Sequence, residues 1–147
     1  MKRLVLTLTL ALSLISLSSF ANDENISPAA IASFNNAFRT ATEVNWSVND
    51  NYFKADFALN GQYVSAFYNE EGKMIAMTRN ISSLQLPIAL QASLKNKYES
   101  YWISGLVEMA TDEGTAYYIT LENADTKLVL KSDVNSDWSS YKKQRKS

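Results

Sequence analysis

The sequence predicts an α+β fold in which a helix followed by an antiparallel meander of strands occurs twice. Two runs of alternating polar and apolar residues flank Asn60-Gly61, a pair that favours a tight β-hairpin. Pro28 and Pro87 each open a run of apolar residues at helical spacing. Short strand-like segments separated by polar turns follow each run. We therefore expect two half-repeats, at about 27–82 and 83–141, although two unrelated α+β segments would give a similar pattern.

The first residues are typical of an export signal. Met1-Lys2-Arg3 is a short basic start, and residues 4–17 are apolar except for Thr and Ser. Ser19-Phe20-Ala21 places small residues where a signal peptidase reads the chain, so we expect a signal peptide over 1–21. The apolar run is shorter than the roughly 20 residues that span a bilayer, which disfavours a membrane anchor. We expect a periplasmic or secreted protein without a membrane span.

The remaining chain, 22–147, is expected to form a single domain with unevenly placed charge. It contains no cysteine, so disulfides cannot contribute to its stability. Four basic residues crowd the end of the chain, and the part before them carries a net charge of −7, which does not suit nucleic acid. The basic tail, 142–147, could touch a membrane surface or an acidic partner, but a solvated, frayed terminus is the favoured interpretation. Its basic residues are Lys142, Lys143, Arg145 and Lys146.

In the first half, Ser27 is a typical N-cap and Pro28 a typical first residue for a helix that we expect to end near Arg39. Phe34 and Phe38 lie on the apolar stripe of this helix. Alternation over 44–48 then predicts a short strand. Two hairpin strands follow between Tyr52 and Asn69, and 73–81 forms a further strand.

The two-residue turn of the hairpin fixes the pairing of its strands, so that Phe57 faces Val64 and Phe53 faces Tyr68. An antiparallel sheet that is buried on one side shows this alternation. One face is expected to be core: Phe53, Ala55, Phe57, Val64, Ala66 and Tyr68. The other is polar with large aromatic residues: Tyr52, Lys54, Asp56, Tyr63, Ser65 and Phe67. We expect the core face of this hairpin to meet both helices, with contacts from Phe34, Phe38, Leu90 and Leu94.

In the second half, Leu86-Pro87 opens a helix with Leu90, Leu94 and Tyr98 on one stripe. Strands are expected over 102–111, 115–122, 127–131 and, as a short final strand, near 138–141. A four-residue turn at 123–126 would pair Glu122 with Lys127 and Tyr118 with Lys131, and both cross-strand pairs are favourable.

The pattern formed by several of these residues resembles that of a known family. The match runs through Phe38, Ala41–Ser47, Tyr52–Phe57, Asn60-Gly61 and Val64–Lys73, and again through Leu86-Pro87. It is similar to the PepSY-like, β-lactamase-inhibitor-like (BLIP-like) family of small exported bacterial proteins, common in Bacteroidetes. The resemblance implies helices packed on one face of a curved antiparallel sheet, with no enzymatic activity and no catalytic residues to carry over. In the second half the usual Asp-x-x-Gly turn is replaced by residues 133–137.

The residue types needed for most enzyme chemistry are missing. Without histidine or cysteine the chain has no catalytic triad, no thiol nucleophile and no common zinc site. Two carboxylates acting together remain conceivable, but Glu70-Glu71 and Asp112-Glu113 lie in turns that are usually solvated. Asp133, Asn135 and Asp137 match the start of a calcium loop, which then fails at its glycine and glutamate positions. We expect no enzyme activity, no metal and no cofactor.

The polar, aromatic sheet face is the candidate partner-binding site. Tyrosine is enriched where one protein grips another, although cross-strand packing, or cover by a second copy or a terminal segment, would also explain these rings. The leading hypothesis is an exported, non-catalytic binding or inhibitory module that holds a protein or peptide on this face. The alternative is a structural or envelope-associated protein acting through self-association or its basic tail, and a carboxylate-based hydrolase is a third hypothesis. The candidate residues are Tyr52, Lys54, Tyr63, Phe67, Tyr118 and Lys131.

Overall fold

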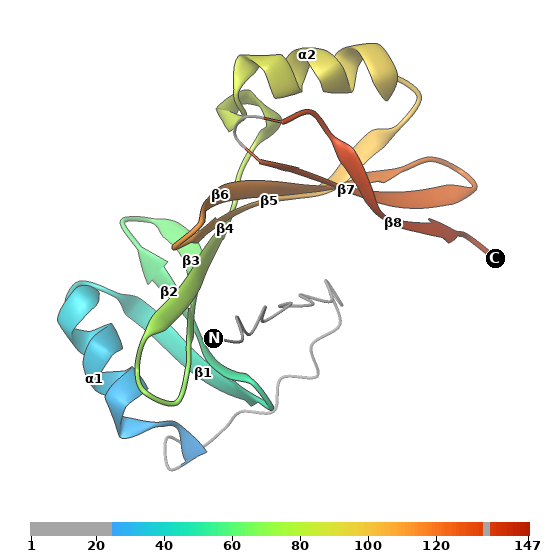
Figure 1. Ribbon diagram of the computed structural model, residues 1–147. Coiled ribbons are helices and arrows are strands. Elements are labelled where there is room, and N and C mark those ends of the chain that lie inside the picture. Colours follow the sequence, from blue (N-terminus) through green and yellow to red (C-terminus); the bar gives the residue numbers. More distant parts are fainter. Residues whose placement is uncertain (1–24, 134–135) are drawn as a thin grey trace, which may run out of the picture.

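The computed structural model describes residues 25–133 and 136–147 (Figure 1), so the expected signal peptide at 1–21 lies outside the described residues. Eight strands form one antiparallel sheet in the order β1 to β8, and each strand pairs with its neighbours in sequence. The elements are α1 (Pro28–Ala37), β1 (Thr42–Asn49), β2 (Tyr52–Leu59), β3 (Gln62–Tyr68), β4 (Met74–Asn80), the 3-10 turn η2 (Ser83–Gln85), α2 (Ile88–Lys97), β5 (Trp102–Thr111), β6 (Gly114–Glu122), β7 (Thr126–Asp133) and β8 (Ser139–Arg145).

The helix starts follow the local chemistry of the sequence. In α1 the Ser27 hydroxyl accepts a hydrogen bond from the Ala30 N–H at 3.4 Å, and Pro28 occupies the first turn, where its missing N–H costs nothing. The helix ends at Ala37, slightly earlier than expected. In α2 Pro87 is the N-cap residue and the helix begins at Ile88, after a 3-10 turn that the sequence did not predict.

The predicted strand pairing is confirmed in both hairpins. Asn60 and Gly61 have φ values of 51° and 79°, which the type I′ turn requires, and Phe57 faces Val64 across it. In the second half, β6 and β7 pair Tyr118 with Lys131 and Glu122 with Lys127, as expected.

Both helices cover the same face of the sheet. Met77 packs against the core under α1, and Arg79, two residues further along β4, shares its face. Arg79 lies opposite Glu108, which lies opposite Tyr117 in the core under α2. Because directly opposed residues share a face, the two cores lie on one side of a continuous sheet. In Figure 1 both helices lie outside the bend of this sheet, so the helix-free face is concave.

Each helix has its own core, which corrects one expectation. Phe34 and Phe38 meet the first hairpin, whereas Leu90 and Leu94 pack on β5 to β7. The expectation that the first hairpin meets both helices is therefore wrong. In the strand order, β4 separates the hairpin of β2 and β3 from the strands on which α2 packs. Between the two cores, Arg79 Nε lies 2.9 Å from Glu108 Oε1.

The C-terminal residues form a longer strand than expected. Instead of a short strand near 138–141 and a frayed tail, β8 continues to Arg145, with Lys142 opposite Val129 on β7. The backbone N–H of Lys146 then donates to the Asp125 carbonyl at 2.8 Å. Trp138 lies in the core before the strand begins. The interpretation of this segment as a frayed terminus is therefore wrong.

Candidate binding face

The concave, helix-free face carries the six residues predicted as a binding site. Cross-strand pairing sets Lys54 opposite Phe67 in the first half and Tyr118 opposite Lys131 in the second. Each half therefore presents a lysine directly across from an aromatic ring. The lysine lies on the earlier strand of the pair in the first half and on the later strand in the second. The structure brings the six residues onto one face, in two clusters rather than at one point.

In the first cluster, Phe67 is a buried support for more accessible side chains. Its ring lies 5.3 Å from that of Tyr52, in an edge-on arrangement, and only 3% of the residue is exposed. Lys54 Nζ lies 3.0 Å from Asp56 Oδ1, and the same carboxylate oxygen accepts a hydrogen bond from the Ser65 hydroxyl. Tyr52 and Lys54 are therefore the more accessible side chains of this cluster, and Phe67 packs against the tyrosine ring.

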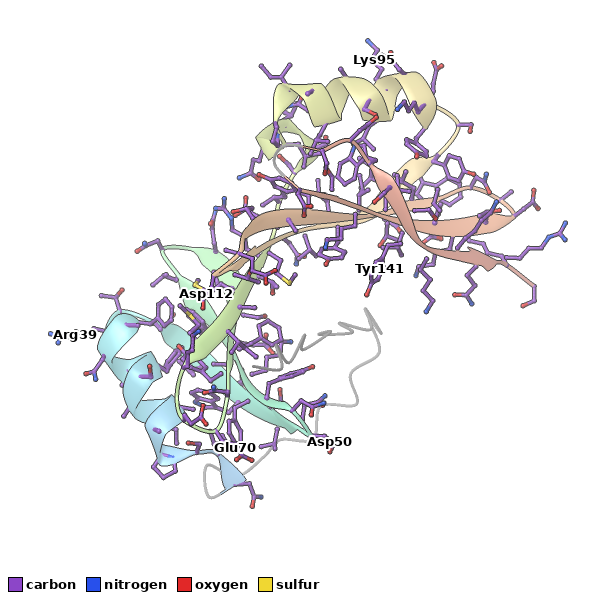
Figure 2. The ribbon with its side chains drawn as sticks, viewed as in Figure 1. Arg39, Asp50, Glu70, Lys95, Asp112 and Tyr141 are labelled. Carbon is purple, nitrogen blue, oxygen red and sulfur yellow. The ribbon has the colours of Figure 1, made fainter. Side chains whose placement is uncertain are left out.

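In the second cluster, Tyr118 plays the supporting role. It is 7% exposed, and burial raises the pKa of its hydroxyl, an effect that Lys131 opposes. The ring of Tyr141 packs edge-on against it at a centroid distance of 5.5 Å, and Lys131 Nζ lies 5.8 Å from the Tyr118 centroid. Tyr141 is 43% exposed, and Figure 2 shows it on the side of β8 away from α2.

Tyr141 shares this face but is not among the residues predicted for it. The sequence pattern placed it at the end of a short strand, and the alternation of apolar residues gave no signal of its facing. The pairing of β7 with β8 contains an irregularity between Val129 and Leu130, next to which Tyr141 reaches the concave face. Such a bulge resets the facing of a strand and leaves no clear mark in a single sequence.

Tyr63 is the most exposed aromatic residue on this face, at 68%. Its hydroxyl donates to Glu43 Oε2 at 2.9 Å, and this hydrogen bond raises the pKa of the tyrosine. Glu43 has a φ of 54° within the irregular start of β1. This hydrogen bond restrains the direction of the exposed ring.

Small side chains line the middle of the concave face. The register places Ser65, Thr78, Met109 and Ala116 in one row across β3 to β6. Apart from Met109, none of them projects far from the sheet. In the strand register this row lies between the row of Lys54 and Phe67 and the row of Tyr118 and Lys131.

The described residues offer little to a metal ion or to paired-carboxylate chemistry. No group of three or more Asp or Glu side chains gathers within 25–133 and 136–147. Asn135 of the calcium-like sequence lies outside the described residues, and Asp137 is already bound by Lys97, Ser93 and the backbone N–H of Trp138. These contacts, that of Lys97 first, lower the pKa of Asp137 to about 2.

Glu70 and Asp112, one carboxylate from each acidic turn, lie apart. Lys73 Nζ lies 2.6 Å from Asp112 Oδ2, and Figure 2 shows Glu70 at a distance from that turn. A hollow of about 210 Å³ beside the end of α2 contains a single carboxylate, that of Glu99. The rest of its lining is Leu94, Lys95, Tyr98, Tyr101, Ile103 and Leu121. The lining of this hollow therefore lacks the pair of carboxylates that glycoside hydrolysis uses.

No helix in the part of the chain that the structure describes has the length and apolar character needed to cross a bilayer.

The fold is shared with solved structures of bacterial proteins. No family model and no curated protein matches the sequence. A BLIP-like protein from Bacteroides fragilis superposes with a TM-score of 0.68 at 16% identity, over 82% of this chain and 86% of that one.

Two DUF2874 family proteins are similar to the same degree. The one from Bacteroides ovatus has a TM-score of 0.71 at 18% identity, over 82% of this chain and 87% of that one. The one from Bacteroides uniformis has a TM-score of 0.71 at 15% identity, over 80% and 88%. The chain therefore has the fold of the BLIP-like and DUF2874 proteins, as its sequence resemblance predicted.

Proposed function

We propose that this protein is an exported, non-catalytic module that binds a protein or peptide on the concave face of its sheet. The observation that carries the proposal is the pair of lysine–aromatic clusters on that face, one in each half, with small side chains between them. A partner lying across the face would meet one cluster at each end. The leader sequence supports export, and the absence of histidine and cysteine supports a role without catalysis.

The exposed and half-buried tyrosines of this face have the composition of a binding surface. Tyr52, Tyr63 and Tyr141 combine large apolar area with a polar tip and few rotatable bonds, so ordering them costs little entropy. Buried Phe67 and Tyr118 hold two of these rings, and Glu43 holds the third. A preorganised surface loses less conformational freedom on binding than a flexible one.

The half-repeats at about 27–82 and 83–141 belong to the same proposal. The elements support them, because a helix and four strands occur in the same order twice. A duplicated unit would explain why each half brings a lysine and an aromatic ring to the same face.

Site-specific photocrosslinking in the native envelope tests the proposed function. A photoreactive residue replaces Tyr63 or Tyr141 on the concave face, or Ile88, which is 83% exposed on α2. We expect the first two positions to give the same crosslinked protein and the third to give none. Crosslinks to that protein from Ile88 alone, or no crosslink from either tyrosine position, would contradict the proposal.

A second variant tests the energy of binding. Replacing Tyr52, Tyr63 and Tyr141 by serine removes three accessible rings and leaves Phe67 and Tyr118 in place. We expect loss of the crosslinked partner from pull-downs, with the folded protein retained by circular dichroism. Replacing Leu84 and Ile88 by serine changes exposed apolar residues elsewhere and serves as the matched control.

A further inference from the structure

The outer edge of the last strand offers a second surface, which adjoins the concave face at Tyr141. β8 pairs with β7 on one side and ends the sheet order on the other, so its outer backbone groups face away from the sheet. All seven residues of β8 are exposed. An edge of this kind can accept a further strand from another chain.

The strand is held in place up to its end. The Ser139 hydroxyl donates to the Lys131 carbonyl at 3.1 Å, and the ring of Tyr141 packs on Tyr118. At the far end, Lys146 Nζ lies 2.7 Å from Glu122 Oε2 and 4.9 Å from the centroid of the Trp102 ring. The edge is therefore ordered before any partner arrives, which reduces the entropy cost of pairing.

Three cations of this edge have no counter-charge in the described structure. Within 25–133 and 136–147, Lys142, Lys143 and Arg145 form no ion pair, whereas Lys146 is engaged with Glu122. The chain before these four residues is acidic. A partner segment that carries carboxylates would complement this edge.

The cations lie on both sides of the edge. Lys142 lies opposite Val129 on β7, and Val129 lies opposite Thr120 on β6, which places Lys142 on the concave side. Lys143 faces Leu128, which packs toward the core under α2. A flat membrane would meet one side of this edge, whereas an extended strand lying along it passes between charges on both sides.

The opposite edge of the sheet differs. β1 contains no lysine or arginine, and its irregular start interrupts strand pairing there. Its one acidic residue, Glu43, already accepts the Tyr63 hydroxyl. The positive charge is thus confined to one of the two edges, where it repels a second β8 and attracts acidic strands.

We propose that β8 binds an acidic, extended segment of another protein by adding it to the sheet as a ninth strand. The main-chain hydrogen bonds of the edge would hold the segment, and Lys142, Lys143 and Arg145 would select for carboxylate side chains. The edge adjoins the concave face at Tyr141, but it would bind through its main chain, so loss of peptide binding here would leave the crosslink expected from Tyr63 on β3 unaffected.

Binding of defined peptides to the full chain without its leader tests this proposal. The probe is a fluorescent peptide of the length of β8 that alternates Glu and Val, measured by anisotropy at low and high salt. We expect saturable binding that weakens with salt, and slower amide exchange in β8 when the peptide is bound. A peptide with Lys in place of Glu, or with alternate amides methylated, should not bind.

Matched variants separate this edge from general surface charge. Replacing Lys142, Lys143 and Arg145 by glutamine should raise the Kd by about tenfold or more. Replacing Arg39 and Lys95 by glutamine, both of which Figure 2 shows on the helix side of the molecule, should leave the Kd within about twofold. Glutamine keeps each side chain long and polar, and circular dichroism checks that both variants fold.

Four outcomes would overturn the proposal. Equal weakening in both variants, or undiminished binding of the methylated peptide, would exclude edge pairing. Binding to vesicles of anionic phospholipid without binding to the Glu-Val peptide would assign the edge to membranes. Sedimentation that shows dimers lost in the glutamine variant, again without peptide binding, would assign it to a second copy.

Discussion

The two halves of the sheet hold their helices by different kinds of contact. Under α1 the contact is aromatic: the Phe34 ring lies 5.3 Å from Phe38, 5.4 Å from Trp46 and 4.9 Å from Phe57. Under α2 the core is largely aliphatic. There the Trp138 indole N–H donates to the Leu90 carbonyl at 3.1 Å, and Asp137 binds Lys97 and Ser93.

The last turns of α1 and α2 differ in how their side chains pack. Phe34 and Leu94 occupy equivalent positions, since the carbonyl of each accepts the N–H of the C-cap residue, at 2.8 Å and 2.9 Å. Phe38 packs on Phe57 at 4.8 Å, whereas Tyr98 lies beside Tyr101 at 6.3 Å. In the second half, Leu94 and Tyr98 line the hollow beside the end of α2. The same architecture thus accommodates close aromatic packing in one half and polar contacts in the other. We call the contacts of Asp137 with Lys97 and Ser93 the polar clamp.

Removal of the indole should give the largest effect. Trp138 is 8% exposed and belongs to the core under α2, so Trp138→Ala should lower the free energy of unfolding by about 3–5 kcal/mol. Trp138→Phe should cost less, because it retains a ring and loses the bond to Leu90. Urea denaturation of the two variants measures this. If both cost the same, packing contributes little and the hydrogen bond alone holds α2.

The first half should be most sensitive at Gly72. A Cβ there would lie 2.6 Å from the backbone carbon and oxygen of Ala29, at a φ of 80°. Gly72→Ala should therefore cost about 2–4 kcal/mol, from backbone strain and the clash with α1.

Gly61 is the matched control, because its φ is 79° and a Cβ there would meet nothing within 4 Å. Gly61→Ala should cost about 1 kcal/mol, from backbone strain alone. Equal losses of stability in the two variants would show that α1 can shift away from the turn at no cost.

Placing the residue type of one half into the other should change the stability by smaller amounts, with a loss in the first half and a gain in the second. Phe34→Leu opens space in the aromatic cluster and should lower stability by about 1 kcal/mol. Leu94→Phe extends a ring toward the hollow beside α2 and should raise stability by up to about 1 kcal/mol. Thermal melts of both variants suffice. A loss of stability in Leu94→Phe would show that the hollow is too narrow for a ring in its existing shape.

The polar clamp of the second half should add a small pH dependence. The pKa of Asp137 falls from 3.8 to about 2 on folding, so its contribution to stability is present above about pH 4 and is lost as the pH falls toward 2. Asp137→Asn should remove this component of the acid sensitivity. Asp112→Asn, which breaks an exposed ion pair in the turn between β5 and β6, should leave it intact. Urea midpoints at pH 5 and pH 2.5 distinguish the two.

Features that are determined by residues close together in the sequence could be predicted, whereas features that depend on distant residues could not. Asn60-Gly61 determined its turn and therefore the register of both flanking strands, because a two-residue hairpin allows one pairing. The facing of Phe67 and Tyr118 followed from that register and its counterpart in the second half. Their burial did not, because Tyr52 and Tyr141 reach them from other strands.

The C-terminal strand shows the limit of pattern reasoning. Its basic residues do not alternate with apolar ones, so the sequence resembles a solvated tail. Pairing with β7 and the contacts of Lys146 determine the strand, and these depend on residues about twenty positions away. Tertiary context of this kind outweighs local preference in short edge strands.

The sequential strand order also bears on how the chain folds. Every strand pairs with the strand next to it in the chain, so no step has to bring distant segments together first. Folding rates rise as the sequence separation of contacting residues falls. The described residues of the first core run from Ile26 to Met77, so this core can assemble while the rest of the chain is still emerging from a ribosome or a translocation channel. The completed edge of β4 would then serve as the template on which β5 and the second half are added.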